Sequence, residues 1–259
     1  MRPAAQKGRR SSSLKGRAHA LLCTVGQRVR PQGESGSRRL RTHPAQGLHH
    51  CRRLRRDGRC RRGKLASDLA ASMFLADFRR EMQAGIAVEP AMRHACDAAN
   101  RAVYDRACAD PDLHGMGTTI VAACVRHGRL TVLHVGDSRA YLACLRRMQQ
   151  LTTDHSLVQE LVASGQVLPE QAHRHPRRNV ITRAVGVGPK VEPDCRTLPF
   201  PPGARLLLCT DGLSNTLTEG QMHDLCRSSR DEKQICSRLI AAALARGARD
   251  NVTALVLFR

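Results

Sequence analysis

Apolar residues recur every three to four positions over two segments in the first half of the chain. Leu65, Leu69, Met73 and Ala76 follow this spacing, which is that of one face of a helix. A second helix is predicted over 89–108, where alanines at the same spacing keep one face small. Because small side chains permit close approach, we expect these helices to pack tightly on a sheet or on each other.

The pattern changes after Thr118 to alternation and to continuous apolar runs, both of which indicate strands. Segments 119–126 and 129–135 flank His127-Gly128, a dipeptide suited to a hairpin turn. A third strand is predicted over 139–145. The middle of the chain is therefore expected to form consecutive antiparallel strands.

The second half of the chain mixes both patterns. A helix is predicted over 155–163, and the segment 176–204 resembles a loop because it is rich in proline and glycine. A buried strand at 205–209, an amphipathic helix at 231–246 and a closing strand at 252–258 complete the prediction. Antiparallel strands with helices between and after them favour an α+β fold built of layers over a doubly wound parallel sheet.

Residues 1–62 differ from the rest, since they are rich in Arg, Ser, Gly and Pro and show no hydrophobic period. Residues 1–64 contain 19 Lys and Arg against Glu34 and Asp57, so +17 of the chain's formal charge of +21 belongs to them. Such a segment cannot bury enough apolar surface to offset its chain entropy. We expect 1–62 to be a disordered basic segment and 63–259 to be the folded domain.

The cysteines and the apolar runs give information about the cellular location of the chain. Its 11 cysteines form no CxxC pair, and several stand inside apolar runs, where a thiol acts as a small hydrophobe. No apolar run approaches the length of a membrane span, and the run at 18–25 is too short for a signal-peptide core. These features predict a reducing, cytoplasmic location and no membrane segment.

Three acidic motifs stand at the ends of predicted strands. They are Gly136-Asp137, Asp211-Gly212 and Asp250-Asn251. Carboxylates that converge at one sheet edge repel each other unless a cation lies between them. An oxygen-only set suits hard divalent cations, so Asp137, Asp211 and Asp250 are the predicted ligands of Mg²⁺ or Mn²⁺.

The order of the motifs resembles that of bacterial metal-dependent serine/threonine protein phosphatases of type 2C. Six segments match the motifs of that family: 115–119, 134–142, 151–158, 179–186, 207–213 and 249–253. The resemblance implies two antiparallel sheets packed as a sandwich with helices outside, and two metal ions, with a third bound more weakly, at the sheet edge. It implies hydrolysis of phosphoserine and phosphothreonine in proteins by a metal-activated water, with a serine/threonine kinase and its substrates as partners.

The resemblance also assigns the three aspartates. Asp211 and Asp250 fall on positions that bind one of the paired metals, and Asp137 on a position of the third metal, shared with Asp211. Thr118, Thr119 and Arg183 are expected to stabilise the fold, and His155 to pack at a helix start; no catalytic or substrate-binding residue is assigned.

The first part of the chain departs from the family. Two family motifs are missing, an Asn-(Glu or Gln)-Asp and an Asp-Gly-Met-Gly-Gly-His that supply a metal-bridging carboxylate; only Asp57-Gly58 stands near the second. The two N-terminal core strands are therefore expected to be lost and the chain to be nearly inactive. A shift of reading frame within 1–62 would restore both motifs.

Other functions stay open from the sequence alone. The domain could be an inactive pseudophosphatase that binds a phosphoprotein or a kinase. The basic segment could bind nucleic acid, although its lack of aromatic residues speaks against base stacking, or it could be an organelle transit peptide or a solvated tail.

Overall fold

Two five-stranded sheets form the centre of the molecule. The computed structural model describes residues 20–28, 38–39, 48–50, 58–173, 175–248 and 250–259. The first sheet has the order β2-β1-β4-β5-β8, and every pair in it is antiparallel. Its strands are β1 (Ala20–Arg28), β2 (Arg38–Arg39), β4 (Gly117–Arg126), β5 (Arg129–Val135) and β8 (Asp194–Pro199).

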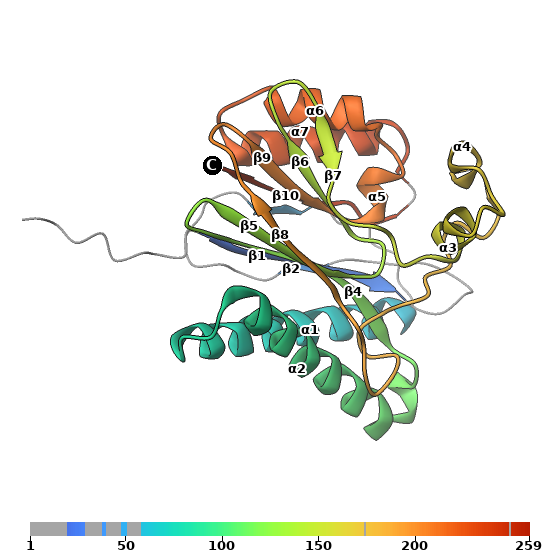
Figure 1. The fold of residues 1–259 in the computed structure, drawn as a ribbon. Helices are drawn as coiled ribbons and strands as arrows, with labels where there is room; N and C mark the ends of the chain where they lie inside the picture. The colour runs from blue at the N-terminus through green and yellow to red at the C-terminus, as the bar shows by residue number, and fades with distance from the viewer. Residues whose placement is uncertain (1–19, 29–37, 40–47, 51–57, 174, 249) are drawn as a thin grey trace, which may run out of the picture.

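The second sheet packs face to face on the first (Figure 1). Its order is β3-β10-β9-β6-β7, again antiparallel throughout. Its strands are β3 (Leu48–His50), β6 (Arg139–Ala143), β7 (Met148–Gln150), β9 (Arg205–Cys209) and β10 (Thr253–Phe258). The predicted α+β class and the sandwich of two sheets are confirmed.

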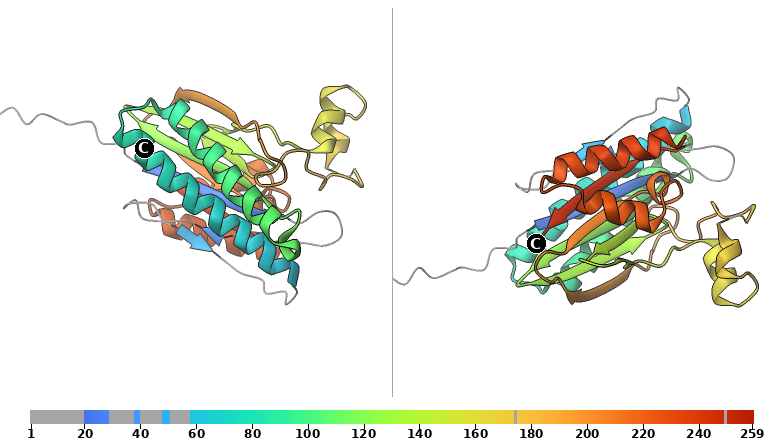
Figure 2. Two further views of the ribbon diagram at one scale, coloured as in Figure 1. Left: turned by 90° about the horizontal axis from the view of Figure 1, so that it is seen from below. Right: turned by 90° about the horizontal axis from the view of Figure 1, so that it is seen from above.

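Helices cover both outer faces of the sandwich (Figures 1 and 2). The long helices α1 (Gly58–Gln83) and α2 (Val88–Ala109) lie on the first sheet, and a short 3₁₀ turn, Pro111–Leu113, follows α2. The second sheet is covered by α5 (Asp211–Ser214), α6 (Glu219–Arg227) and α7 (Glu232–Ala245). The short helices α3 (Leu157–Ala163) and α4 (Pro169–Ala172) stand off from the body in all three views.

The apolar runs of the sequence are explained by strands that are buried on both faces. In β4, Ile120 and Ala122 face α1 and α2, whereas Val121 and Ala123 face the second sheet. β9 alternates in the same way, with its Leu206 between the sheets. Because both faces of these strands are buried away from water, their sequences are continuous hydrophobic runs, although the strands are antiparallel. No helix among the described residues is long and apolar enough to cross a membrane.

The prediction that the N-terminal strands are lost is wrong. β1 pairs with β4 along its whole length, from Ala20 opposite Val125 to Arg28 opposite Gly117, and β3 pairs with β10. The physical reason is the apolar run that begins β1, which is too short for a signal-peptide core but long enough for one strand. Residues 1–19, 29–37, 40–47 and 51–57 lie outside the described residues, so the domain boundary at 63 stays a prediction, although α1 already begins at Gly58.

One strand was hidden in the segment that resembled a loop. β8 lies at the edge of the first sheet, next to β5, and prolines flank or end it at 193 and 199. Proline is tolerated at the ends of edge strands, so it does not exclude a strand there. This strand matters for the site because it begins with Asp194.

Candidate active site

The strand register brings two of the predicted ligands to the same sheet edge. β6 begins two residues after Asp137, and β9 ends two residues before Asp211. Arg139 pairs with Cys209 at the end of this ladder, so Asp137 and Asp211 each lie two residues beyond it. The two aspartates therefore leave neighbouring strands at one end of the second sheet.

Asp250 reaches the same edge through contacts of the backbone. Thr210 bridges to the segment before β10, since its Oγ1 donates to Asn251 O at 3.1 Å and accepts from Thr253 N at 3.0 Å. A Cβ at Gly212 would lie 2.4 Å from Asn251 O and 3.3 Å from Asp250 O. Glycine thus permits the close approach of the two backbones that carry Asp211 and Asp250.

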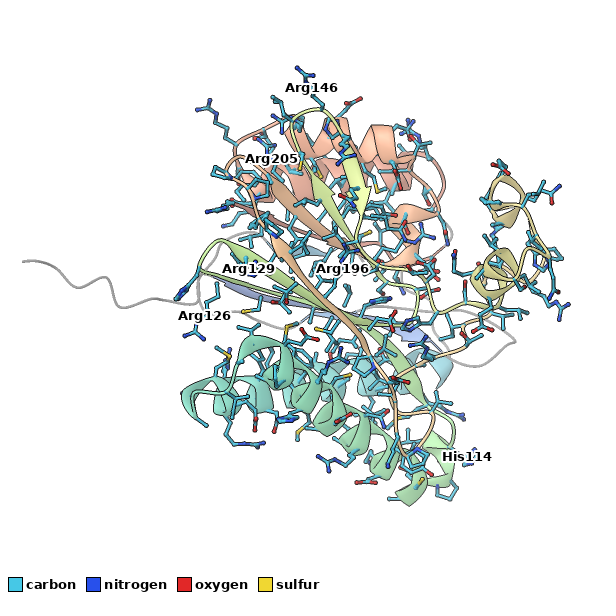
Figure 3. The ribbon with its side chains drawn as sticks, viewed as in Figure 1. His114, Arg126, Arg129, Arg146, Arg196 and Arg205 are labelled. Atoms are coloured by element: carbon cyan, nitrogen blue, oxygen red, sulfur yellow. The ribbon has the colours of Figure 1, made fainter. Side chains whose placement is uncertain are left out.

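These three aspartates fit a hard divalent cation by the chemistry of their donors. Asp137 is buried, and Asp211 and Asp250 are half-buried, so all three carboxylates are partly withdrawn from water. Arg126, Arg129 and Arg205, which Figure 3 labels, lie at the other end of the strands. Carboxylates at such an edge are stabilised by a bound cation. The assignment of the three as metal ligands stays a prediction.

A second cluster joins side chains that the sequence did not connect. His134, His155 and Asp194 offer nitrogen and oxygen atoms within 4.8 Å of one another, and the two imidazole rings stack with centroids 4.6 Å apart. The sequence pattern gave no sign of this cluster, because Asp194 lay in the segment that resembled a loop. The register of β5 and β8 creates it by pairing His134 with Asp194.

The hydrogen bonds of this cluster do not fit a metal ion. The Gly136 N–H donates to His155 Nδ1 at 3.1 Å, so Nδ1 carries no proton and the neutral ring carries its proton on Nε2. A metal on that Nε2 would require the imidazolate. His134 Nε2 lies 2.8 Å from Thr153 O, which can only accept, so this nitrogen also carries a proton. The cluster is therefore a hydrogen-bonding unit.

Burial keeps both histidines neutral. Burial, together with the nearby His134 and Arg183, lowers the pKa of His155 to about 4, against the raising effect of Asp194. Burial also lowers the pKa of His134, against the raising effect of its bond to Thr153. At pH 7 neither ring is protonated to the imidazolium, which agrees with the tautomers that the hydrogen bonds require.

The low pKa of His155 predicts acid destabilisation. Its pKa is about 4 in the folded chain and 6.5 when unperturbed, so between these values the unfolded chain binds a proton that the folded chain does not. The contribution of His155 to the free energy of unfolding is fully present above about pH 6.5. It falls toward pH 4, by at most about 3 kcal/mol. Urea unfolding at pH 7, 5.5 and 4.5 should show a shallower dependence in His155→Phe than in the wild type; equal slopes would contradict the prediction.

The residues assigned to the fold do bind other parts of the fold. Thr119 Oγ1 and Ser138 Oγ lie 2.9 Å apart, and Thr118 forms an isolated bridge with Val185. Arg183 Nη1 lies 2.9 Å from Asp194 Oδ1. The sequence-based interpretation of these three residues as structural agrees with these contacts.

Comparison with known proteins places these features in a family. The model of a family described as Protein phosphatase 2C matches residues 57–246. The serine/threonine phosphatase stp of Listeria welshimeri is 39% identical over 202 residues, which are 77% of this chain and 80% of that protein.

Solved structures give the same result. Serine/threonine phosphatase Stp1 from Staphylococcus aureus has a TM-score of 0.67 at 30% identity, covering 75% of this chain and 77% of that one. The catalytic domain of the serine/threonine protein phosphatase PstP, solved with two manganese ions, has a TM-score of 0.66 at 28% identity, covering 92% and 97%. Because the family match spans more than half of the chain, the chain belongs to the protein phosphatase 2C family.

Proposed function

We propose that this chain is a metal-dependent serine/threonine protein phosphatase whose metals are held at the edge of the second sheet. The observation that supports this most directly is the convergence of Asp137, Asp211 and Asp250 on that edge. The names of its relatives, which are serine/threonine phosphatases, support the substrate class of phosphoserine and phosphothreonine in proteins.

The proposed roles follow from the positions of the side chains. Asp211 and Asp250 hold one divalent cation, Mn²⁺ or Mg²⁺, because their backbones touch at Gly212. Asp137 and Asp211 each lie two residues beyond the last pair of β6 and β9, and in this proposal they hold a weaker one. When bound, such ions lower the pKa of water and screen the charge of a phosphoryl group. The chain's own contribution is to fix the carboxylates on strand ends, where their orientation changes little.

Arg139 is not proposed as a ligand of the substrate phosphate. Its guanidinium forms a two-pronged ion pair with Asp154, with Nε 2.8 Å from Oδ1 and Nη2 2.7 Å from Oδ2. A further hydrogen bond joins its Nη1 to the Tyr141 hydroxyl at 3.1 Å. An arginine so engaged stabilises the start of β6 and is held away from the role of a free phosphate ligand.

Phosphatase activity is predicted to depend on added metal. Release of phosphate from a phosphothreonine peptide should require Mn²⁺ or Mg²⁺ and should stop in excess chelator, because the carboxylates alone cannot activate water. Adding back the metal should restore the rate. Turnover that continues in excess chelator would contradict the metal assignment. The partners proposed are phosphorylated proteins and a serine/threonine kinase that shares them, in the cytoplasm.

A second function is supported by the missing metal-bridging carboxylate. The sequence lacks the Asp-Gly-Met-Gly-Gly-His motif, and the second proposal is a pseudophosphatase that binds a phosphoprotein or a kinase without hydrolysis. The two proposals differ in one measurement. A pseudophosphatase would retain a phosphopeptide in a pull-down and release no phosphate from it at saturating Mn²⁺.

A further inference from the structure

His155 bonds to Gly136 through two of its groups. Its backbone N–H donates to the Gly136 carbonyl at 3.0 Å, and its Nδ1 accepts from the Gly136 N–H at 3.1 Å. Gly136 directly precedes Asp137 and has a φ of 103°, a conformation that favours glycine. A Cβ there would lie 2.3 Å from Thr119 Cγ2. His155 thus provides hydrogen-bond partners for both the N–H and the carbonyl of Gly136, the residue that turns the chain into Asp137.

Ser138 and Arg139, the two residues after Asp137, are also held by contacts of their side chains. Ser138 Oγ lies 2.9 Å from Thr119 Oγ1, and Arg139 forms its ion pair with Asp154. Asp154 and His155 are consecutive, so one short segment holds the residues on both sides of Asp137. The aspartate has little freedom except in its own side chain.

The far side of the His155 ring connects to other segments. Its Nε2 lies 3.4 Å from Asp194 Oδ2, and Asp194 is in turn paired with Arg183. The carbonyl of His155 accepts from Thr182 N at 2.9 Å. The His155 side chain is 3% exposed, whereas the Asp194 side chain is 50% exposed. His155 therefore joins the Asp137 turn to the chain that returns from α4.

We infer that His155 is a positioning residue for the Asp137 carboxylate, acting through the Gly136 amide. One consequence of this inference, that metal affinity depends on the contact between His155 and Gly136, rests on the proposed function. The positioning of Asp137 itself does not. The contact needs a neutral ring with an unprotonated Nδ1, which places the proton on Nε2, 3.4 Å from Asp194 Oδ2. A purely space-filling ring would make no such demand, because an aromatic hydrocarbon could replace it.

Three substitutions separate these roles. His155→Asn places an amide oxygen near the position of Nδ1, where it can accept from Gly136 N–H. His155→Gln reaches instead toward the position of Nε2 and keeps a donor to Asp194. His155→Phe keeps the stacked ring on His134 and loses both polar contacts. The Asn and Gln variants are a matched pair, since they differ in which ring nitrogen the amide replaces.

The first measurement is amide hydrogen exchange at Gly136, by NMR on the full chain without metal. We expect exchange to be roughly fivefold to tenfold faster in His155→Phe and His155→Gln, the effect of losing one hydrogen bond, and close to the wild type in His155→Asn. Mn²⁺ affinity measured by calorimetry should fall in the same order. A merely structural role would give the largest effect in the Asn variant, which removes most volume.

Several results would overturn the inference. One is a Gln variant that protects Gly136 as well as the Asn variant does. Another, which needs no variant, is a nitrogen NMR spectrum of wild-type His155 that shows the proton on Nδ1. If the wild type binds no Mn²⁺, the proposed function fails, while the exchange data still decide the positioning role. Faster exchange with unchanged Mn²⁺ affinity would overturn the link to the carboxylate.

Discussion

Replacing Asp211 or Asp250 by Asn should abolish any phosphatase activity that the chain has, and should weaken Mn²⁺ binding. Each substitution keeps the shape of the side chain and removes one charged oxygen ligand, and hard divalent cations depend on such ligands. A metal contributes several kcal/mol to stabilising the transition state, so the rate should fall on the order of 10²- to 10³-fold. The checks are phosphate release from a phosphothreonine peptide and Mn²⁺ titration by calorimetry.

The control for this prediction is Asp224→Asn. Asp224 lies on α6 with its side chain 85% exposed, and its ion-pair partner among the described residues is the neighbouring His223. Removing its charge changes the net charge as the other two substitutions do, yet it should leave the rate and the metal affinity unchanged. Undiminished turnover in Asp211→Asn or Asp250→Asn would refute the ligand assignment.

Most of the fold could be predicted because its strands are buried in dry layers. The predicted segments 119–126 and 129–135 match β4 and β5 closely, since a continuous apolar run leaves few alternatives. β8 was missed because an edge strand needs no apolar face of its own and tolerates its flanking prolines. β1 was missed for another reason: the high charge of 1–62 hid a short run that pairs with β4.

The candidate site also has one part that the sequence could predict and one that it could not. Asp137, Asp211 and Asp250 could be proposed as ligands because each follows or precedes a recognisable strand, and strand ends are where a rigid scaffold orients a side chain. The cluster around His155 could not be predicted, because its parts meet only through the register of β5 with β8. Its tautomers depend on which backbone groups face the ring, and the sequence does not contain that information.

Residues 1–62 are predicted to be a family N-terminus translated in the wrong frame. Residues 55–59 can be encoded CGA CGG GAT GGG CGG, and reading from the second base gives Asp-Gly-Met-Gly-Gly. Residues 33–37 as GGA GAA TCA GGA TCN give Glu-Asn-Gln-Asp in the same shifted frame. Both missing motifs emerge in family order. The coding DNA must then have GAT at codon 57, and GAA, TCA and GGA at codons 34, 35 and 36.

If those codons are found, restoring one base near codons 59–62 should recover the metal-bridging aspartate. The chain as written is expected to turn over a phosphothreonine peptide slowly or not at all, because without that carboxylate the paired metals lack a shared ligand. The restored chain should be faster on the order of 10²-fold or more, the rate equivalent of several kcal/mol of charge stabilisation. A matched restored chain with that aspartate changed to Asn serves as the control.

The structure indicates which properties of the protein the restored reading frame should change most. In the chain as written, β1 already covers the edge of β4, so the first sheet does not end in an unpaired β4. The larger effect of restoration is therefore expected on metal affinity and rate, and the smaller one on thermal stability. Robust metal-dependent turnover by the unaltered chain would show that the missing carboxylate is replaced by another ligand. Other codons at 34, 35, 36 or 57 would refute the frame shift and leave a natural basic segment on the phosphatase domain.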